Sequence, residues 1–184
     1  MKVSIISTSN NWAEIKNAAM TTVGKEAGSY PSSKWKRQLL KSEHSPIRKL
    51  VINWKWEDLL SWVSVHFVRH KYGIEHFVKS QRSDRTGVDR NTLTQSELIA
   101  HECSANAQAL IFISRKRLCN MASKETREAW QAVKDAIKEY EPELSSVMVR
   151  ECVYRGGICN EFYPCGFNKS EEFKAELEQY IKGE

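Results

Sequence analysis

Apolar and polar residues alternate in two segments of the chain, and this pattern predicts two strands. Residues 2–7 alternate β-branched with polar side chains, which is typical of a short strand. In residues 50–56 every second side chain is Leu, Ile or Trp. That segment is therefore predicted to be a strand with one apolar face.

Apolar residues at helical spacing predict six helices, over residues 12–23, 35–40, 59–68, 98–113, 125–140 and 171–182. Asn10 or Asn11 can cap the first helix, Ser33 the second and Ser123 the fifth. The segment 59–68 has the apolar density of a buried helix, whereas the last helix is expected to be mostly solvated.

The fourth predicted helix carries a broad apolar face and can be capped by Thr94 or Ser96. Arg115, Lys116 and Arg117 then lie in its C-terminal half, where the helix dipole tolerates cations. Considered alone, all three would be the solvated polar face of an amphipathic helix.

Polar, turn-rich segments separate these elements at residues 28–33, 42–48 and 84–94. The chain from about residue 147 differs, because Gly, Pro and three of the cysteines are concentrated there. We therefore expect a single domain over residues 1–184, with a Cys/Gly-rich C-terminal tail at about 147–184.

Composition excludes some classes of protein. No apolar run reaches the roughly twenty residues of a membrane span, and the N-terminal segment is too soon polar for a signal peptide, so a cytoplasmic protein without a membrane partner is expected. Five cysteines in such a chain favour reduced thiols over disulfides. The net charge of +5 suits an anionic ligand such as a nucleotide.

Ionisable side chains are most concentrated in residues 69–85, here called the cationic stretch. It follows directly on the apolar segment 59–68, so packing should fix its first residues, Arg69 and His70. Guanidinium groups match phosphate geometry, and histidine changes charge near neutral pH. The stretch therefore predicts an anion-binding site.

Several short motifs occur in an order that resembles the flavin-dependent thymidylate synthases. They are His44-Ser45-Pro46, Arg69-His70-Lys71, Ser80-Gln81-Arg82, Asn106-Ala107-Gln108, and Arg117 followed by Ala122, Glu125 and Arg127. The family carries an Arg-His-Arg motif followed by Ser-x-Arg, and then an Asn-Ala-Arg motif. Lys71 and Gln108 stand where the family has arginine, and His66 stands where it usually has glutamine. The chain is similar to the compact members of the family that phages encode.

The resemblance implies an α+β fold with a mixed β-sheet and long helices, in a homotetramer whose active sites lie at subunit interfaces. It also implies conversion of dUMP to dTMP with FAD, with methylenetetrahydrofolate as carbon donor and NADPH as reductant of the flavin. The reduced flavin supplies the hydride, and no protein cysteine acts as nucleophile.

Carried over residue by residue, the resemblance gives an expected site without a metal. Arg117 and His70 are the expected catalytic residues. The cofactor-binding set is His44, Arg69, His70, Lys71, Asn106 and Gln108. The substrate-binding set is His66, Ser80, Arg82, Arg90 and Arg117.

Each of these residues also has a purely structural interpretation. Arg69 and Arg82 could be solvated charges, His70 and His76 satisfied structural histidines, and Asn106 a side chain bonded to backbone.

The tail cysteines Cys152, Cys159 and Cys165 could bind zinc if Cys119 or a histidine joined them, or could pack as small apolar groups.

Two other functions stay open. One is a pyrimidine-nucleotide methylase or hydroxymethylase on the same fold. The other is a basic zinc and nucleic-acid-binding protein without enzymatic activity, although the aromatic residues are not interleaved with the basic ones, so no nucleic acid partner is expected.

Overall fold

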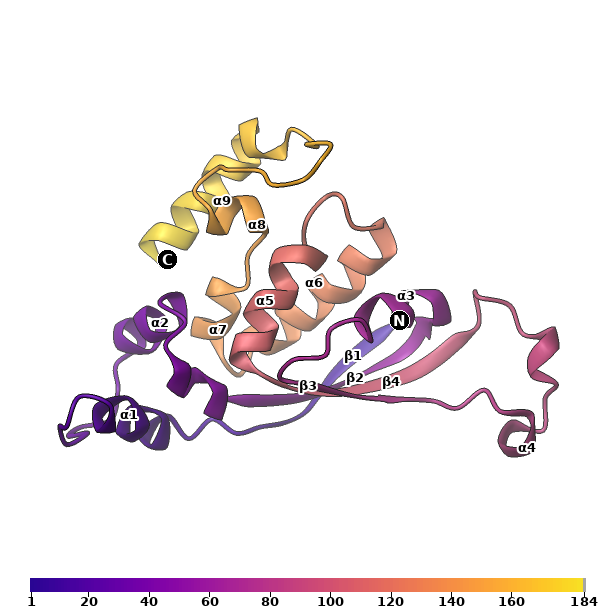
Figure 1. Cartoon of the computed structure of the whole chain (residues 1–184), viewed down its shortest axis with the longest axis horizontal. Helices are drawn as coiled ribbons and strands as arrows, with labels where there is room; N and C mark the ends of the chain where they lie inside the picture. The colour runs from indigo at the N-terminus through magenta and orange to yellow at the C-terminus, as the bar shows by residue number, and fades with distance from the viewer. Residues whose placement is uncertain (184) are drawn as a thin grey trace.

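A β-sheet with helices packed on one face forms the body of the molecule in this computed structural model, which describes residues 1–183 (Figure 1). Within those residues the sheet has four strands in the order β1-β2-β4-β3. They are β1 (Lys2–Thr8), β2 (Val51–Leu60), β3 (Ile74–Val78) and β4 (Leu98–Asn106).

All three strand pairings are antiparallel, so the α+β class is confirmed and the expectation of a mixed sheet is wrong. The physical reason lies in the strand order. β2 and β3 run in the same direction, but β4 lies between them and pairs with both in the opposite sense.

The strands β1 and β2 follow the alternation in the sequence. Trp54 and Trp56 are fully buried on β2, and they pack edge to face with ring centroids 5.5 Å apart. β2 runs on to Leu60 through an irregularity in register between Trp56 and Leu59, where Asp58 adopts φ 57°. The helix predicted at 59–68 is therefore shorter, α3 (Ser61–Phe67).

The segment 98–106, predicted as helix, is β4, one of the two inner strands. Its inward residues Ile99, His101, Cys103 and Ala105 are buried in strict alternation. Apolar residues in this short segment fit both helical and strand spacing, and pairing with two neighbouring strands decides the outcome. β3, which lies inside the cationic stretch, was not predicted.

Helix α5 (Ala107–Arg117) begins directly where β4 ends. The N-terminal helices are α1 (Trp12–Thr21), capped by Asn11 as expected, and α2 (Ser33–Lys41), capped by Ser32 rather than Ser33. A 3-10 turn, η1 (Ser45–Lys49), precedes β2.

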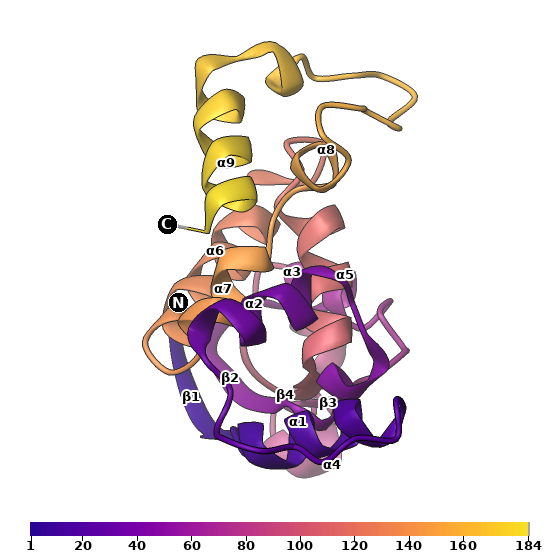
Figure 2. The same cartoon turned by 90° about the vertical axis from the view of Figure 1, so that its left-hand side faces the viewer.

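The C-terminal half is helical. α6 (Lys124–Lys138) is capped by Ser123 as predicted. The remaining helices are α7 (Pro142–Val147), α8 (Glu151–Tyr154), η3 (Phe167–Lys169) and α9 (Glu171–Lys182). In the side view α8 and α9 lie beyond the helices that cover the sheet (Figure 2). Buried Val153, Phe167 and Tyr180 join these helices to the main hydrophobic core.

Residues 79–97, here called the arm, connect β3 to β4 and project beyond the end of the sheet (Figure 1). The arm contains two short turns of helix, α4 (Ser83–Thr86) and η2 (Arg90–Thr92), where a loop was predicted. It therefore places its charged residues far from the helices α1 and α2 at the other end of the sheet.

Candidate active site

A cleft of about 570 Å³ opens between the turn that precedes β3 and the first half of α5. One wall consists of Arg69, His70, Lys71, Tyr72 and Gly73, with Arg48 beside them. The other wall consists of Asn106, Gln108, Ala109, Phe112 and Ile113. Five of the six predicted cofactor-binding residues thus line one cleft, although the two walls come from separate parts of the sequence.

The junction of β4 and α5 fixes the second wall. Asn106 caps α5, because its Oδ1 accepts a hydrogen bond from the backbone N–H of Ala109 at 3.0 Å. Its own backbone N–H donates to the carbonyl of Gly73 at 2.9 Å. The sequence predicted Asn106 inside a helix over residues 98–113, whereas in the structure it is the N-cap of α5. The cleft therefore faces the first turn of α5, whose dipole favours negative charge.

Gly73 lets the two walls approach closely. Its φ is +71°, and a Cβ at this position would lie 2.6 Å from Nδ2 of Asn106. Only glycine tolerates both the left-handed backbone and the contact. The turn and the Asn106 side chain are thus packed directly against each other.

His70 and Arg117 form a half-buried pair at the edge of the cleft. Nε of Arg117 donates to Nε2 of His70 at 2.8 Å, and its Nη2 donates to the carbonyl of His66 at 2.6 Å. Because arginine is only a donor, Nε2 of His70 must accept, which leaves the imidazole proton on Nδ1. Arg117 does not line the cleft itself and reaches it through His70.

The electrostatics of this pair favour a neutral histidine. Burial, reinforced by the charge of Arg117 and then by His76, lowers the pKa of His70 to about 4. The pKa of Arg117 is lowered by burial and then by Arg69. At neutral pH the pair is therefore an uncharged imidazole fixed by a guanidinium.

Gln108 is held by a carboxylate from a distant part of the sequence, the loop before η1. Its Nε2 donates to Glu43, and Glu43 also forms an ion pair with Arg115. Arg115 is 9% exposed, and its guanidinium lies 3.5 Å from the ring centroid of Tyr154. The expectation of a solvated Arg115 is therefore wrong, since tertiary packing supplies it with a partly buried acid and an aromatic ring.

His44 and His66 lie outside the cleft lining. His44 is exposed at the start of η1. His66 bonds through Nδ1 to Oγ1 of Thr126 at 2.8 Å. Burial, and then the charges of Arg117 and Arg69, lower the pKa of His66. His66 contacts the predicted catalytic pair through its backbone carbonyl, which accepts a hydrogen bond from Arg117.

The remaining predicted substrate residues are on the arm. Arg82 is exposed and pairs bidentately with Asp84, at 3.0 and 2.7 Å. Ser80 lines a separate, smaller pocket, and Arg90 is exposed in η2. A single chain thus brings Arg69 and Arg117 to His70 but leaves Ser80, Arg82 and Arg90 apart from them.

Sequence reasoning did not single out Arg48, Tyr72 and Phe112 as cleft residues. Tyr72 and Phe112 are 92% and 54% exposed. For Tyr72 the available signal was its position directly after Arg69-His70-Lys71, because an aromatic side chain beside cations suits a planar ring ligand. The sequence carried no such signal for Phe112.

The tail cysteines gather around a small cavity of about 20 Å³, lined by Cys119, Cys152, Cys159 and Cys165. Cys119 thus does join them from elsewhere in the fold. Burial raises the pKa of Cys119 and raises that of Cys152 to about 11. Among the residues described, no three of these sulfur atoms lie within 4.8 Å of one another.

Comparison with solved structures identifies the architecture. No protein-family model matches the sequence, and no curated protein matches it. The flavin-dependent thymidylate synthase ThyX from Helicobacter pylori, complexed with FAD and dUMP, has a TM-score of 0.68 at 15% identity, over 82% of this chain and 100% of that chain. The UMP/dUMP methylase PolB from Streptomyces cacaoi, bound with 5-Br dUMP, has a TM-score of 0.62 at 14% identity, over 79% of this chain and 93% of that chain.

The chain therefore shares the architecture of these two proteins, an antiparallel sheet with helices on one face. More specifically, its fold is that of the flavin-dependent thymidylate synthases, as the order of the motifs predicted. Within residues 1–183, none of the helices combines the length and apolar character that a bilayer span requires.

Proposed function

We propose that this protein is a flavin-dependent methylase that converts dUMP to dTMP. The observation that carries the proposal is the cleft, because residues 69–73 line one wall and Asn106, Gln108 and Ala109 line the other. These residues come from the two motifs that resemble the flavin-binding motifs of the family. The solved protein of the same fold from Helicobacter pylori is complexed with FAD and dUMP.

The cleft residues fit the chemistry of FAD. Arg48, Arg69 and Lys71 supply cations for a pyrophosphate, and the first turn of α5 adds the helix dipole. Tyr72 and Phe112 offer exposed rings on which a planar group can stack. When bound and reduced, FAD supplies the hydride, while methylenetetrahydrofolate supplies the carbon and NADPH the reducing equivalents.

His70 and Arg117 are the proposed catalytic residues. Arg117 fixes the His70 ring with a 2.8 Å hydrogen bond to Nε2, so that Nδ1–H can donate to a ligand carbonyl or ring nitrogen. A neutral imidazole donates without adding a full charge to the cleft. Asn106 and Gln108 add directional amide groups that orient the ligand.

The nucleotide phosphate is proposed to bind between subunits of a homotetramer. Ser80, Arg82 and Arg90 lie on the projecting arm, away from the cleft of their own chain. An arm from a neighbouring subunit can bring these residues to the cleft, where Arg82 would exchange Asp84 for phosphate. In this arrangement His66 contributes its carbonyl to hold Arg117, and His44 lies on the loop next to Glu43 and the Gln108 side of the cleft.

The test combines an absorption spectrum with a turnover assay. We expect purified protein supplied with FAD to show a bound-flavin spectrum that changes on titration with dUMP. Turnover with methylenetetrahydrofolate and NADPH should then yield dTMP. Protein that neither binds FAD nor responds to dUMP would exclude the proposal.

A second candidate is methylation or hydroxymethylation of a different pyrimidine nucleotide. It is favoured by the likeness to a protein described as a UMP/dUMP methylase. Gln108, held by Glu43, also removes a positive charge relative to the family motif. Lys71 keeps the charge but lacks the bidentate guanidinium fork. Competition between UMP and dUMP for labelled methylenetetrahydrofolate, with identification of the labelled product, separates the candidates.

The non-enzymatic alternative, a basic zinc and nucleic-acid-binding protein, makes an opposite prediction. It requires binding to DNA or RNA that falls steeply with salt. It also requires no response of a flavin spectrum to nucleotide.

A further inference from the structure

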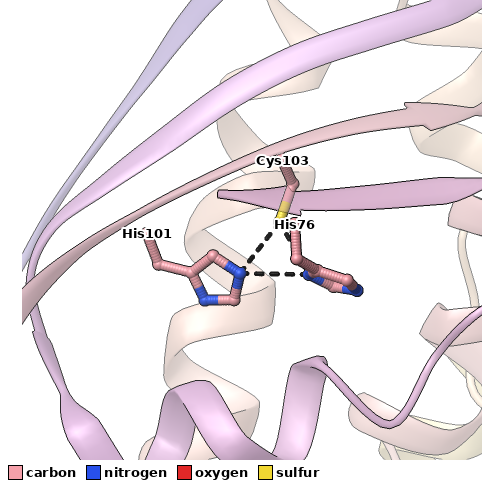
Figure 3. Close-up of side chains that lie close together, drawn as sticks. All are labelled: His76, His101 and Cys103. Atoms are coloured by element: carbon pink, nitrogen blue, oxygen red, sulfur yellow. Dashed lines mark hydrogen bonds between the residues drawn. The ribbon is translucent and has the colours of Figure 1, made fainter. Parts of the chain in front are cut away.

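Three metal-binding side chains converge between β3 and β4 (Figure 3). His76 on β3 is the register partner of Cys103 on β4. His101 lies two residues before Cys103, so both point to the same face of the sheet. Strand pairing thus places two imidazoles and a thiol together, and His101 and Cys103 are each 0% exposed.

The three donor atoms are spaced like ligands of one ion. Nδ1 of His76 lies 3.0 Å from Nε2 of His101, and Sγ of Cys103 lies 3.2 and 3.3 Å from these nitrogens. A tetrahedral zinc ion, with Zn–N near 2.0 Å and Zn–S near 2.3 Å, requires ligand atoms roughly 3.3–3.6 Å apart. Small side-chain shifts would admit the ion. Within residues 1–183 this is the one place where three or more His, Cys, Asp or Glu residues have ligand atoms that all lie within 4.8 Å of one another.

The outer nitrogen of each histidine is already occupied by a partner that orients the ring. Nε2 of His76 lies 2.9 Å from the carbonyl of His70. Nδ1 of His101 lies 3.0 Å from Oγ of the buried Ser64. Metal-ligating histidines usually have such a partner, which fixes the tautomer and the ring plane. The remaining nitrogens, Nδ1 of His76 and Nε2 of His101, both face Cys103.

A metal-free network accounts for the same contacts less completely. Ser64 can donate to His101, His101 to His76, and His76 to the carbonyl of His70. In that series of hydrogen bonds the inward nitrogens of both histidines are used. The S–H of buried Cys103 then has no free nitrogen lone pair in the cluster to which it can donate. Metal binding would resolve this, because the thiol proton is released to solvent and the thiolate bonds to the ion.

We propose that His76, His101 and Cys103 bind a divalent transition metal, zinc foremost, in a site with three protein ligands and an open fourth position. The metal ties β3 to β4 and, through His76, holds the carbonyl of His70 at the edge of the cleft. This site is independent of the proposed methylase function.

Cobalt substitution tests the proposal directly. Full-length protein is stripped with a chelator and titrated with Co²⁺ alone. We expect one equivalent per chain, tetrahedral d–d bands, and a thiolate-to-cobalt charge-transfer band that Zn²⁺ abolishes. A wild-type titration without that band would overturn the proposal, whatever happens to the variants.

Variants then locate the ion. Cys103→Ser should lose the charge-transfer band, and His76→Gln, at a partly exposed residue, should weaken metal affinity without a risk to the buried core. Ser64→Ala should weaken it by roughly 10–100-fold. Cys152→Ser is the matched control, because it removes a thiol from the tail cavity, and it should leave the band intact. A band that disappears with Cys152→Ser and persists in Cys103→Ser and His76→Gln would assign the metal to the tail and overturn the proposal.

Discussion

Arg115 and Arg117 are two residues apart on the last turns of α5, but the fold uses them differently. Arg115 is buried with Glu43 and stacks on Tyr154. Arg117 donates to His70 and to the carbonyl of His66. Lys116 between them is exposed and pairs with Glu161. Arg115 therefore acts on the cleft only through Glu43, which holds Gln108. Arg117 bonds directly to the cleft residue His70.

Arg117→Ala should weaken dUMP binding by about 1.5–3 kcal/mol, because it removes charge-assisted hydrogen bonds that fix His70. The matched control is Lys116→Ala, which removes an exposed charge next to it in sequence and should leave affinity unchanged. Titration of the flavin spectrum with dUMP measures both. A folded Arg117→Ala protein with wild-type affinity would remove Arg117 from the site.

His66 should make the fold sensitive to acid. Burial, and then the charges of Arg117 and Arg69, lower its pKa in the folded state. His66 therefore binds a proton more readily in the unfolded chain than in the folded one. Its contribution to stability is complete above about pH 6.5 and is lost as the pH falls below that value. The loss of unfolding free energy between about pH 7 and about pH 5.5 should be smaller in His66→Gln than in wild type. Equal losses in chemical denaturation experiments would contradict this.

At the scale of elements, the turn before β3 and the start of α5 depend on each other. The backbone of Gly73 bonds to Asn106, and the Asn106 side chain fills the space over Gly73. The same asparagine ends β4 and caps α5. One contact therefore sets the separation of the two cleft walls.

Gly73→Ala should destabilise the fold by about 1–3 kcal/mol and impair flavin binding, because it combines left-handed strain with displacement of Asn106. Gly87→Ala separates the two effects. Gly87 has φ +72°, but nothing lies within 4 Å of the methyl group that alanine would add there. It should therefore show only the strain, with flavin affinity unchanged. Thermal denaturation and flavin titration of both variants provide the comparison. If Gly73→Ala and Gly87→Ala bound flavin equally well, the contact between Gly73 and Asn106 would have no role in flavin binding.

At the scale of the whole molecule, the arm and the cleft lie apart on one chain. The arm carries Ser80, Arg82 and Arg90 beyond the end of the sheet (Figure 1). If the proposed function is correct, a complete site requires two chains. This arrangement predicts complementation between variants.

Co-expressed Arg82→Ala and Arg117→Ala chains should regain activity that neither has alone. With equal amounts and random assembly, about a quarter of the sites would combine an intact cleft with an intact arm. The matched control is the pair Arg69→Ala and Arg117→Ala, whose defects lie on the same cleft, so that no site is restored. Activity of the first mixture no higher than the mean of its two components would refute the shared site.

Much of the cleft could be predicted from the sequence, because its walls come from short motifs that resemble those of a known family. Through that resemblance Arg69, His70, Lys71, Asn106 and Gln108 are predicted to bind the cofactor, and they line one cleft. The convergence of His76, His101 and Cys103 could not be predicted, since His76 and Cys103 are 27 residues apart and meet only through the register of a strand pair.

The sequence by itself determined the elements whose signals are local. The alternation of residues 50–56 gives β2, and the caps Asn11 and Ser123 start α1 and α6. Tertiary structure alone decided that residues 98–106 are a strand, that Arg115 is buried, and that the arm lies away from the cleft. The physical reason is that a cap or an alternation acts over a few residues, whereas burial and strand register depend on partners that only the folded chain brings together.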